Sequence, residues 1–192
     1  YQYQYAMTGD TWRWSAGAFE LTDLPVPAIP LQNAATALMA LGVADLEIAD
    51  THITEGLASV SVTGRMQVIA DAPYTVFDVA HNPHAAAYLA NKLAEQKAKS
   101  AGRVHAVVAM LADKDIDGTL ACLDGIVDYW YPASLAVPRG ASADTLPVVA
   151  SAQFDSPSDA YQCALSQAEP ERDCVVVFGS FHTVGQVMET LN

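Results

Sequence analysis

Residues 174–183 read Cys-Val-Val-Val-Phe-Gly-Ser-Phe-His-Thr, and this stretch decides the fold. It opens with five apolar residues in a row, which predict a strand that is buried on both faces. Gly179 and Ser180 then predict a turn into a helix, with Ser180 as the N-cap. A doubly covered strand that leads into a helix is typical of a parallel sheet between two layers of helices. The stretch therefore predicts an α/β fold.

The same alternation of strand and helix extends towards the N-terminus as far as residue 66. The run Val104–Val108 is as apolar as Cys174–Phe178, so it is a second candidate for a central strand. Strands are predicted at residues 75–79, 104–110, 126–131 and 174–178, with a short one at 153–154 and an edge strand at 66–69 that forms a hairpin with 75–79. Helices are predicted at residues 83–99, 116–123, 142–150, 158–168 and 182–191. We therefore expect a mostly parallel sheet that is covered by helices.

The N-terminal third has a different pattern. Residues 1–22 alternate between apolar and polar in the manner of strands, which predicts a small β-meander with a turn at Gly9-Asp10. Helices are predicted at residues 33–41, where Gly42 ends the helix, and at residues 50–58. Because the strand–helix alternation begins after Val62–Arg65, we place a domain boundary there.

The composition limits the classes of function. Apolar residues make up 52% of the 192 residues, which is enough for a buried core, and no apolar run reaches the roughly 18 residues of a membrane helix. With 9 basic and 22 acidic residues the formal charge is −13, and no basic stripe suits a nucleic acid. The three cysteines form no C-x-x-C pair, so we expect reduced, buried thiols in a cytoplasmic protein.

The histidines give no sign of a metal centre. His81 and His84 lie three residues apart, but no cysteine or acidic residue completes a ligand set, so we expect no metal site in this chain. His105 lies inside an apolar strand and is expected to be a core residue. The sequence also contains no G-x-x-x-x-G-K-[S/T] and hence no phosphate loop of that type.

Polar residues cluster where the predicted strands end. The carboxyl ends of parallel strands share one edge of a sheet, and ligands bind in the crevice there. The residues brought to this edge, or to the boundary beside it, are Arg65, Asp78, His81, Lys114, Arg139, Ser180 and His182. We therefore expect a site in which a few cations and histidines bind an anionic small molecule.

Part of this pattern has a structural interpretation. Asn82 is a good N-cap and Pro83 suits the first position of a helix, and Ser180 is also expected as a cap. Asp78 and His81 are not explained by capping. A carboxylate at a strand end can accept a hydrogen bond from a ribose hydroxyl, and a histidine beside it can orient a carboxylate or a phosphate.

Several motifs, in order and spacing, resemble the bacterial dihydrofolate synthase/folylpolyglutamate synthase family of the Mur ligase superfamily. Asp78-Val-Ala-His-Asn-Pro-His-Ala-Ala86 resembles its hallmark, and Gly64-Arg-Met-Gln67 resembles its domain junction. The segments Leu24–Ala37, Met110–Asp115, Pro138–Ala141 and Gly179–Val184 match as well. The resemblance covers essentially the whole chain.

The resemblance implies an enzyme with a P-loop ATPase domain followed by a Rossmann-like domain. Residues 1–63 would be the C-terminal tail of the ATPase domain, and residues 64–192 the glutamate-ligase domain. The P-loop and the magnesium ligands would precede Tyr1, so the chain alone is expected to be inactive. The implied cofactors are ATP and Mg²⁺. The implied setting is the cytoplasm, and the full-length enzyme is expected to be a monomer.

The activity implied by the resemblance is ATP-dependent amide formation through an acyl phosphate. L-Glutamate would be added to dihydropteroate and to reduced folates, and no nucleic acid or membrane would take part. The nucleotide contacts are expected at Asn33, Arg65 and Asp78. A catalytic role near the nucleotide and the incoming glutamate is expected for His81. The glutamate site is expected to involve Lys114, Arg139, Ser180 and His182.

Two other functions stay open. One is a different Mur-type ligase, such as a muramyl-peptide or poly-amino-acid synthetase, although Gly179–Thr183 and Pro138–Ala141 favour the folate branch. The other is a non-catalytic, Rossmann-like binding module. The β-meander at residues 1–22 argues against a module, because it looks cut from a larger domain.

Overall fold

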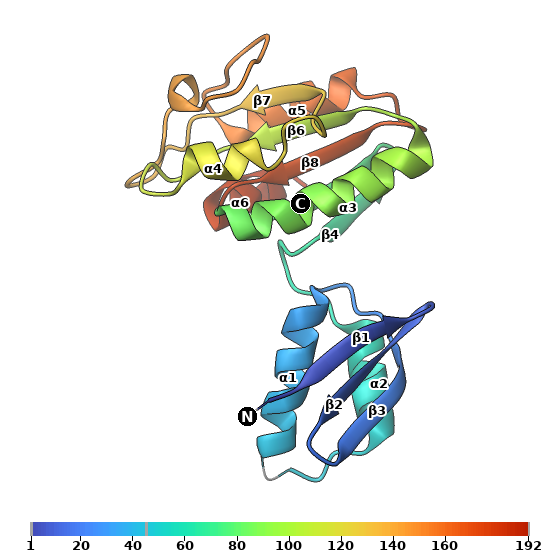
Figure 1. The fold of residues 1–192 in the computed structure, drawn as a ribbon. Coiled ribbons are helices and arrows are strands. Elements are labelled where there is room, and N and C mark those ends of the chain that lie inside the picture. The colour runs from blue at the N-terminus through green and yellow to red at the C-terminus, as the bar shows by residue number, and fades with distance from the viewer. Residues whose placement is uncertain (1, 45, 192) are drawn as a thin grey trace. The chain divides into compact units, whose positions relative to one another are not determined.

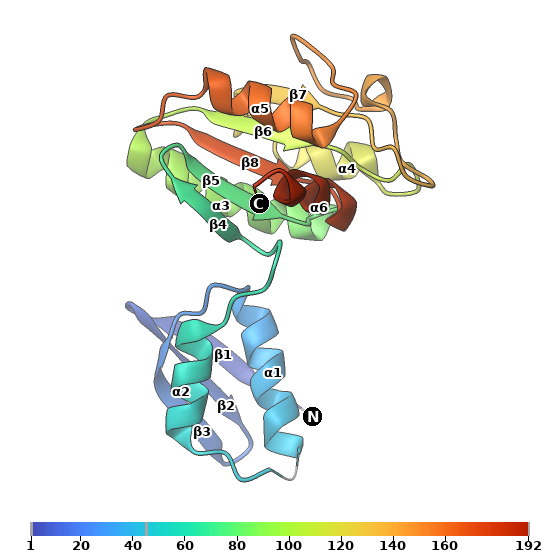
Figure 2. The same cartoon turned by 180° about the vertical axis from the view of Figure 1, so that it is seen from behind.

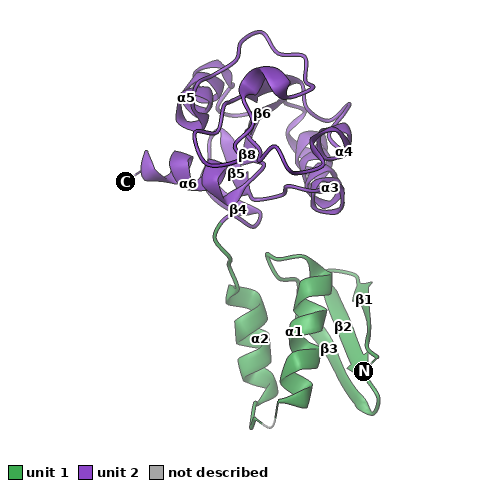
Figure 3. Cartoon of the chain, turned by 90° about the vertical axis from the view of Figure 1, so that its left-hand side faces the viewer, with its two compact units in different colours: residues 1–63 green, residues 64–192 purple. Residues whose placement is uncertain are grey.

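The computed structural model describes residues 2–44 and 46–191. It divides into two compact units, residues 1–63 and 64–192, which are coloured separately in Figure 3. Tyr1, at the start of the expected meander, lies outside the described residues. None of the described helices is both long and apolar enough to cross a membrane.

The first unit is a three-stranded antiparallel sheet with two helices. Its elements are β1 (Gln4–Thr8), β2 (Thr11–Ala16), β3 (Phe19–Pro25), α1 (Leu31–Val43) and α2 (Asp50–Ser59), and the strand order is β1-β2-β3. The predicted meander is therefore confirmed within the described residues. Trp12 and Trp14 point from β2 into the core, and the Trp14 indole donates a hydrogen bond to the carbonyl of Ala35 in α1 at 3.0 Å. This bond ties the sheet to the helix.

Helix α1 is longer at both ends than expected. It begins directly after Pro30, whose carbonyl accepts from the backbone N–H groups of Asn33 and Ala34. Gly42, expected to end the helix, lies inside it, and Ala44 is the C-cap. A glycine costs a helix only about 1 kcal/mol, so it does not stop one that packs against a sheet.

The second unit is built on a five-stranded sheet with the order β4-β5-β8-β6-β7. Its strands are β4 (Gln67–Asp71), β5 (Tyr74–Asp78), β6 (Val104–Val108), β7 (Tyr129–Pro132) and β8 (Cys174–Phe178). Its helices are α3 (Pro83–Ser100), α4 (Ile116–Ala121), α5 (Pro157–Gln167) and α6 (Phe181–Glu189). The edge strand β4 is antiparallel to β5, and the other strand pairs are parallel. The prediction of a mostly parallel sheet with an N-terminal edge hairpin is confirmed.

Helices cover both faces of this sheet, as Figures 1 and 2 show from opposite sides. Helices α3 and α4 pack on one face, with Leu89, Leu93 and Leu120 in the core. Helices α5 and α6 pack on the other, with Tyr161 and Val187 in the core. All five residues of β6 and of β8 are buried, which agrees with their continuous apolar runs.

One predicted helix is wrong. Residues 142–150 form only a short 3₁₀ turn at Ala143–Thr145. The chain then runs without a helix or strand to Ser156, and the short strand expected at residues 153–154 is reduced to an isolated bridge between Phe154 and Ala133. Pro147 explains the difference, because proline disfavours the helical conformation of the residue before it and cannot donate a backbone hydrogen bond. The expected helix would have placed Pro147 in its interior.

Two smaller expectations also need correction. The strand predicted at residues 126–131 forms at Tyr129–Pro132, because Ile126 and Val127 close the turn after α4 by donating to the carbonyl of Leu123. Of the three cysteines, all free thiols, Cys174 is buried, whereas Cys122 and Cys163 are only half-buried. Cys163, in α5, packs at the edge of the core, and Cys122 is the C-cap of α4.

Candidate functional site

A pocket lies at the carboxyl edge of the sheet in the second unit. Three neighbouring parallel strands, β5, β8 and β6, end beside it. Its volume is about 260 Å³, and its lining residues are His81, Leu111, Lys114, Gly179, Ser180, Phe181 and His182. Four of the residues expected at this edge therefore line one pocket, namely His81, Lys114, Ser180 and His182.

His81 is held in a defined orientation. Its Nδ1 lies 2.7 Å from the carbonyl oxygen of Val79. A carbonyl only accepts hydrogen bonds, so Nδ1 carries the proton and donates it. In the neutral ring Nε2 is then the acceptor, and no described residue hydrogen-bonds to it. The ring therefore presents a fixed acceptor at the pocket.

The two cations expected on this edge differ in their surroundings. Lys114 lines the pocket and forms no ion pair with a described residue. Arg139 does not line the pocket. Its guanidinium pairs with the carboxylate of Asp113 at 2.6 Å, and its side chain is 66% exposed. The structure thus brings Lys114, but not Arg139, to the pocket wall.

The turn from β8 into α6 is built by close backbone packing. Gly179 has φ of +116°, and a Cβ there would lie 2.3 Å from the carbonyl oxygen of Ala109. Ser180 caps α6 by accepting from the backbone N–H of Thr183 at 3.0 Å. The Thr183 hydroxyl donates to the Ala109 carbonyl, so the Ser180 hydroxyl must donate to Thr183 Oγ1, at 2.7 Å. The expected capping role of Ser180 is confirmed, and its hydroxyl is already engaged within the protein.

Asp78, the last residue of β5, is only 6% exposed. One carboxylate oxygen accepts from the backbone N–H of Ala80 at 2.7 Å, and the other from that of Met66 at 2.9 Å. Burial raises the pKa of this carboxyl group, while the two backbone hydrogen bonds and the positive charge of Arg65 oppose the rise. Asp78 therefore fixes the domain-boundary segment to the end of β5, and each oxygen keeps a lone pair for a further donor.

Phe181 is a residue of this site that the sequence reasoning did not select. Its ring is 63% exposed, lines the pocket and lies under the guanidinium of Arg65, with Cζ 5.7 Å from the ring centroid. The sequence signal for Phe181 is an apolar residue that directly follows a strongly predicted N-cap, on the outer side of an amphipathic helix.

Asn33, the remaining expected nucleotide contact, belongs to the first unit. It lies in the first turn of α1, where its side chain is exposed and its backbone N–H donates to the Pro30 carbonyl at 2.8 Å. It lies outside the unit that holds the pocket.

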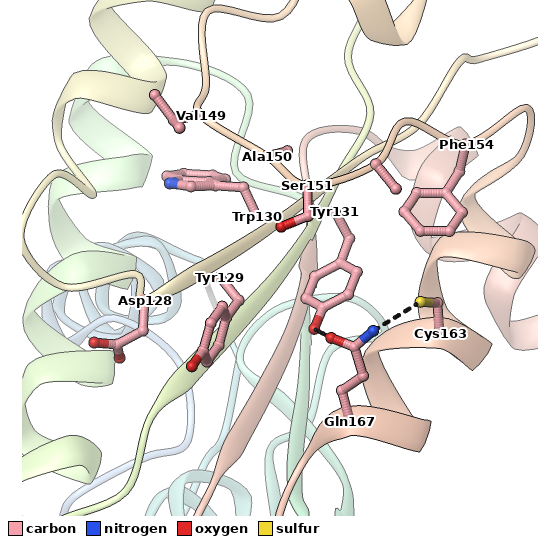
Figure 4. A pocket seen from close by; sticks show the side chains of 11 residues that line it. Asp128, Tyr129, Trp130, Tyr131, Val149, Ala150, Ser151, Phe154, Cys163 and Gln167 are labelled. Atoms are coloured by element: carbon pink, nitrogen blue, oxygen red, sulfur yellow. Dashed lines mark hydrogen bonds between the residues drawn. The ribbon is translucent and has the colours of Figure 1, made fainter.

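A second pocket lies beside the edge strand β7 and is shown in Figure 4. It is lined largely by aromatic residues of β7 and by the segment 149–152. Three of its polar side chains contact one another: the Tyr131 hydroxyl lies 3.0 Å from the Gln167 side-chain oxygen, and the Gln167 amide contacts the Cys163 sulfur at 3.5 Å. These groups are occupied by one another, and none of the residues expected in the site lies there.

The residues present suit anionic groups better than a metal ion. No group of three or more His, Cys, Asp or Glu that could hold a metal occurs in residues 2–44 and 46–191. Lys114 and the N-terminus of α6 lie at the pocket, and Arg65 lies at its rim on Phe181. Because a helix N-terminus and cations favour negative charge, the arrangement fits carboxylate or phosphate groups.

Comparisons with known proteins point to one family of ligases. The chain is 45% identical, over 193 residues, to the dihydrofolate synthase/folylpolyglutamate synthase of Escherichia coli. The aligned region covers 100% of this chain and 45% of that protein. A structure of E. coli FolC in complex with DHPP and ADP aligns with a TM-score of 0.92 and 45% identity, over 98% of this chain and 45% of that one.

A second group of structures gives the same result. The Yersinia pestis folylpolyglutamate synthase/dihydrofolate synthase complexed with AMPPNP and Mn ion aligns at a TM-score of 0.91 and 48% identity, over 98% of this chain and 45% of that one. The chain therefore spans slightly less than half the length of these relatives. The family model described as Mur ligase, glutamate ligase domain matches residues 64–181. The chain belongs to the Mur ligase family, of which residues 64–181 form the glutamate ligase domain.

Proposed function

We propose that this chain is part of an ATP-dependent ligase that adds L-glutamate to dihydropteroate and to reduced folates. The single observation that carries the proposal is the pocket in which His81, Lys114 and His182 converge at the ends of parallel strands. A bifunctional relative with Mn, AMPPNP and L-glutamate bound has the same fold, with a TM-score of 0.91 over 98% of this chain.

In the proposed reaction a pterin-linked carboxylate attacks the γ-phosphate of ATP, which gives an acyl phosphate and ADP. The amine of glutamate then attacks the acyl carbon, and phosphate leaves. Positioning and neutralisation of charge account for most of the catalysis of phosphoryl transfer. The chain contributes groups of this kind, namely the cations Lys114 and Arg65 and the imidazole of His81, which Val79 holds in place.

Each residue at the pocket has a proposed role in this reaction. Lys114 and His182 bind the carboxylates of the incoming glutamate, aided by the N-terminus of α6. His81 directs Nε2 towards the glutamate amine, because Val79 holds Nδ1. Arg65 contacts the nucleotide phosphates, and Asp78 uses its free lone pairs for the nucleotide. Asn33 is proposed as a further nucleotide contact. Arg139 and Ser180, which are already paired, are at most secondary contacts for glutamate.

We also propose a division of labour within the complete enzyme. The described residues bring no metal ligand set together, and the chain spans 45% of its relatives. We therefore assign the Mg²⁺ ligands and the P-loop to the remaining part, and residues 1–63 to the end of its ATPase domain. We propose a cytoplasmic monomer, in which the three free thiols stay reduced.

The proposal is tested by supplying ATP, dihydropteroate and L-glutamate to the chain and, in parallel, to the enzyme extended to the length of its relatives. The extended enzyme should release phosphate and form the glutamylated product, and the chain alone should release none above background. Turnover by the chain alone would refute the division of labour. An extended enzyme that ignores glutamate but uses another amino acid would place it elsewhere in the Mur ligase family.

A further inference from the structure

The segment Gly64–Gln67 is held on several sides by the end of β5. The Val79 N–H donates to the Gly64 carbonyl at 2.7 Å, and Asp78 accepts the Met66 N–H at 2.9 Å. Gly64 donates to the side chain of Gln67 at 2.9 Å. The backbone on either side of Arg65 is therefore fixed.

Backbone conformation reinforces this arrangement. Gly64 and Met66, the neighbours of Arg65, both have positive φ, of +67° and +46°. A Cβ on Gly64 would come within 2.8 Å of the Val79 side chain, so the segment lies tightly against β5. Holding a non-glycine residue such as Met66 in the left-handed region costs free energy, which the hydrogen bond to Asp78 helps to offset. The turn thus fixes the point from which the Arg65 side chain extends.

The free end of Arg65 lies on one aromatic ring. Its guanidinium carbon is 5.7 Å from the centroid of the Phe181 ring. The Phe181 ring is 63% exposed and belongs to none of the apolar clusters of the described residues, so core packing does not explain it. The same ring lines the pocket beside Lys114 and His182. It therefore stands between the pocket and Arg65.

We propose that Phe181 is a positioning residue: its ring holds the Arg65 guanidinium at the rim of the pocket, ready for the nucleotide phosphates. An aromatic face attracts a cation and leaves the N–H groups at the edge of the guanidinium free for an anion. The proposal rests on the nucleotide role of Arg65 under the proposed function. It adds a residue whose contribution acts through Arg65.

The test uses the complete, active enzyme with Phe181→Leu, which removes the ring and keeps an apolar side chain. A cation–π contact at an exposed site corresponds to a roughly twofold to fivefold effect, so the KM for ATP should rise by that factor with kcat unchanged. The dissociation constant of a non-hydrolysable ATP analogue, measured by calorimetry, should rise equally. Phe181→Tyr and Phe181→Trp, which keep an aromatic face, should restore both values.

A double-mutant cycle separates this inference from the proposed function. Arg65→Gln should raise the KM for ATP, and adding Phe181→Leu should then change nothing more. If Phe181→Leu acts equally with and without Arg65, or raises the KM for glutamate alone, the positioning role is wrong while the ligase function stands. If Arg65→Gln leaves ATP binding unchanged, the nucleotide role of Arg65 and the inference fall together.

The chain offers a matched control. At the amino end of the sheet Arg103 lies over the ring of Tyr129, with Cζ 5.5 Å from the ring centroid. Tyr129→Leu removes a ring from under an arginine at the first residue of β7, together with the hydrogen bond that Arg103 donates to the Tyr129 hydroxyl, so it perturbs its arginine at least as much. It should leave the KM for ATP and kcat unchanged. An equal rise of the KM for ATP in this variant would show that losing such a pair acts through general stability, and would overturn the inference.

Discussion

At the scale of single residues, the site depends on positions where only one residue type fits. At Gly179, φ of +116° disfavours any side chain, and a Cβ would also lie 2.3 Å from the Ala109 carbonyl oxygen. Relief would require β6 and β8 to move apart at the pocket. We predict that Gly179→Ala lowers the free energy of unfolding by roughly 2–4 kcal/mol, as measured by urea denaturation of this chain.

The control for this prediction lies six residues further on. Gly185 is inside α6, and a Cβ there would meet no atom within 4 Å. Gly185→Ala should therefore raise the free energy of unfolding by about 0.5–1 kcal/mol, because alanine loses less backbone entropy in a helix. Equal destabilisation by the two substitutions would show that helix α6, rather than the close approach at Gly179, is the sensitive feature.

At the scale of elements, the sequence predicted what depends on local pattern. The runs in β6 and β8 were recognised because both faces of these strands are buried, and Asn82 and Ser180 were recognised because caps have a strong residue preference. The helix expected at residues 142–150 does not form, because Pro147 interrupts a stretch whose composition otherwise favours a helix.

Local sequence patterns do not predict which polar side chains pair when they lie far apart in the chain. The sequence brought Arg139 to the same edge as Lys114, but it gave no sign that Asp113 would pair with Arg139 across 26 positions. The sequence predicted that the Asp78 carboxylate can accept a hydrogen bond from a ribose hydroxyl. In the fold this carboxylate accepts one from the backbone N–H of Met66. Which partner a polar side chain selects depends on distances that only the packed strands define.

The start of α6 is tied to the end of β6 through one hydroxyl. Thr183 donates to the Ala109 carbonyl at 2.7 Å and accepts from Ser180, and all three groups are buried. Thr183→Val keeps the shape and leaves the Ser180 hydroxyl and the Ala109 carbonyl without this partner. We predict a loss of about 1–3 kcal/mol in the free energy of unfolding. Thr190→Val removes only a hydrogen bond to the Val187 carbonyl at the C-terminal end of α6, and should lower the free energy of unfolding by less than about 0.5 kcal/mol.

At the scale of the whole molecule, the end of the sheet opposite the pocket is held by a buried polar network. His105 on β6 lies with Nδ1 2.8 Å from the Tyr131 hydroxyl and Nε2 3.2 Å from the carboxylate of Asp173. Asp173 also accepts from the backbone N–H groups of Arg103 and Glu169, at 2.8 Å and 2.9 Å. The network thus joins β6, β7 and the segment that leads into β8, and the expectation that His105 is a core residue is confirmed.

This network gives the fold a pH dependence with a definite sign. Burial lowers the pKa of His105 below its ordinary value of 6.5, despite the opposing effect of Asp173. The unfolded chain therefore binds the proton more readily, so the free energy of unfolding declines as the pH falls below 6.5, until the folded pKa is passed.

We predict that the thermal midpoint is lower at pH 5.5 than at pH 7.5. In a chain of this size, a loss of about 1 kcal/mol in stability corresponds to a decrease of roughly 2–4 °C. His105→Gln should lower the midpoint at pH 7.5 and flatten its dependence over this range, whereas the same change at the exposed His84 should leave the slope as it was. If the slope survives in His105→Gln, the acid sensitivity arises elsewhere and the network only adds rigidity.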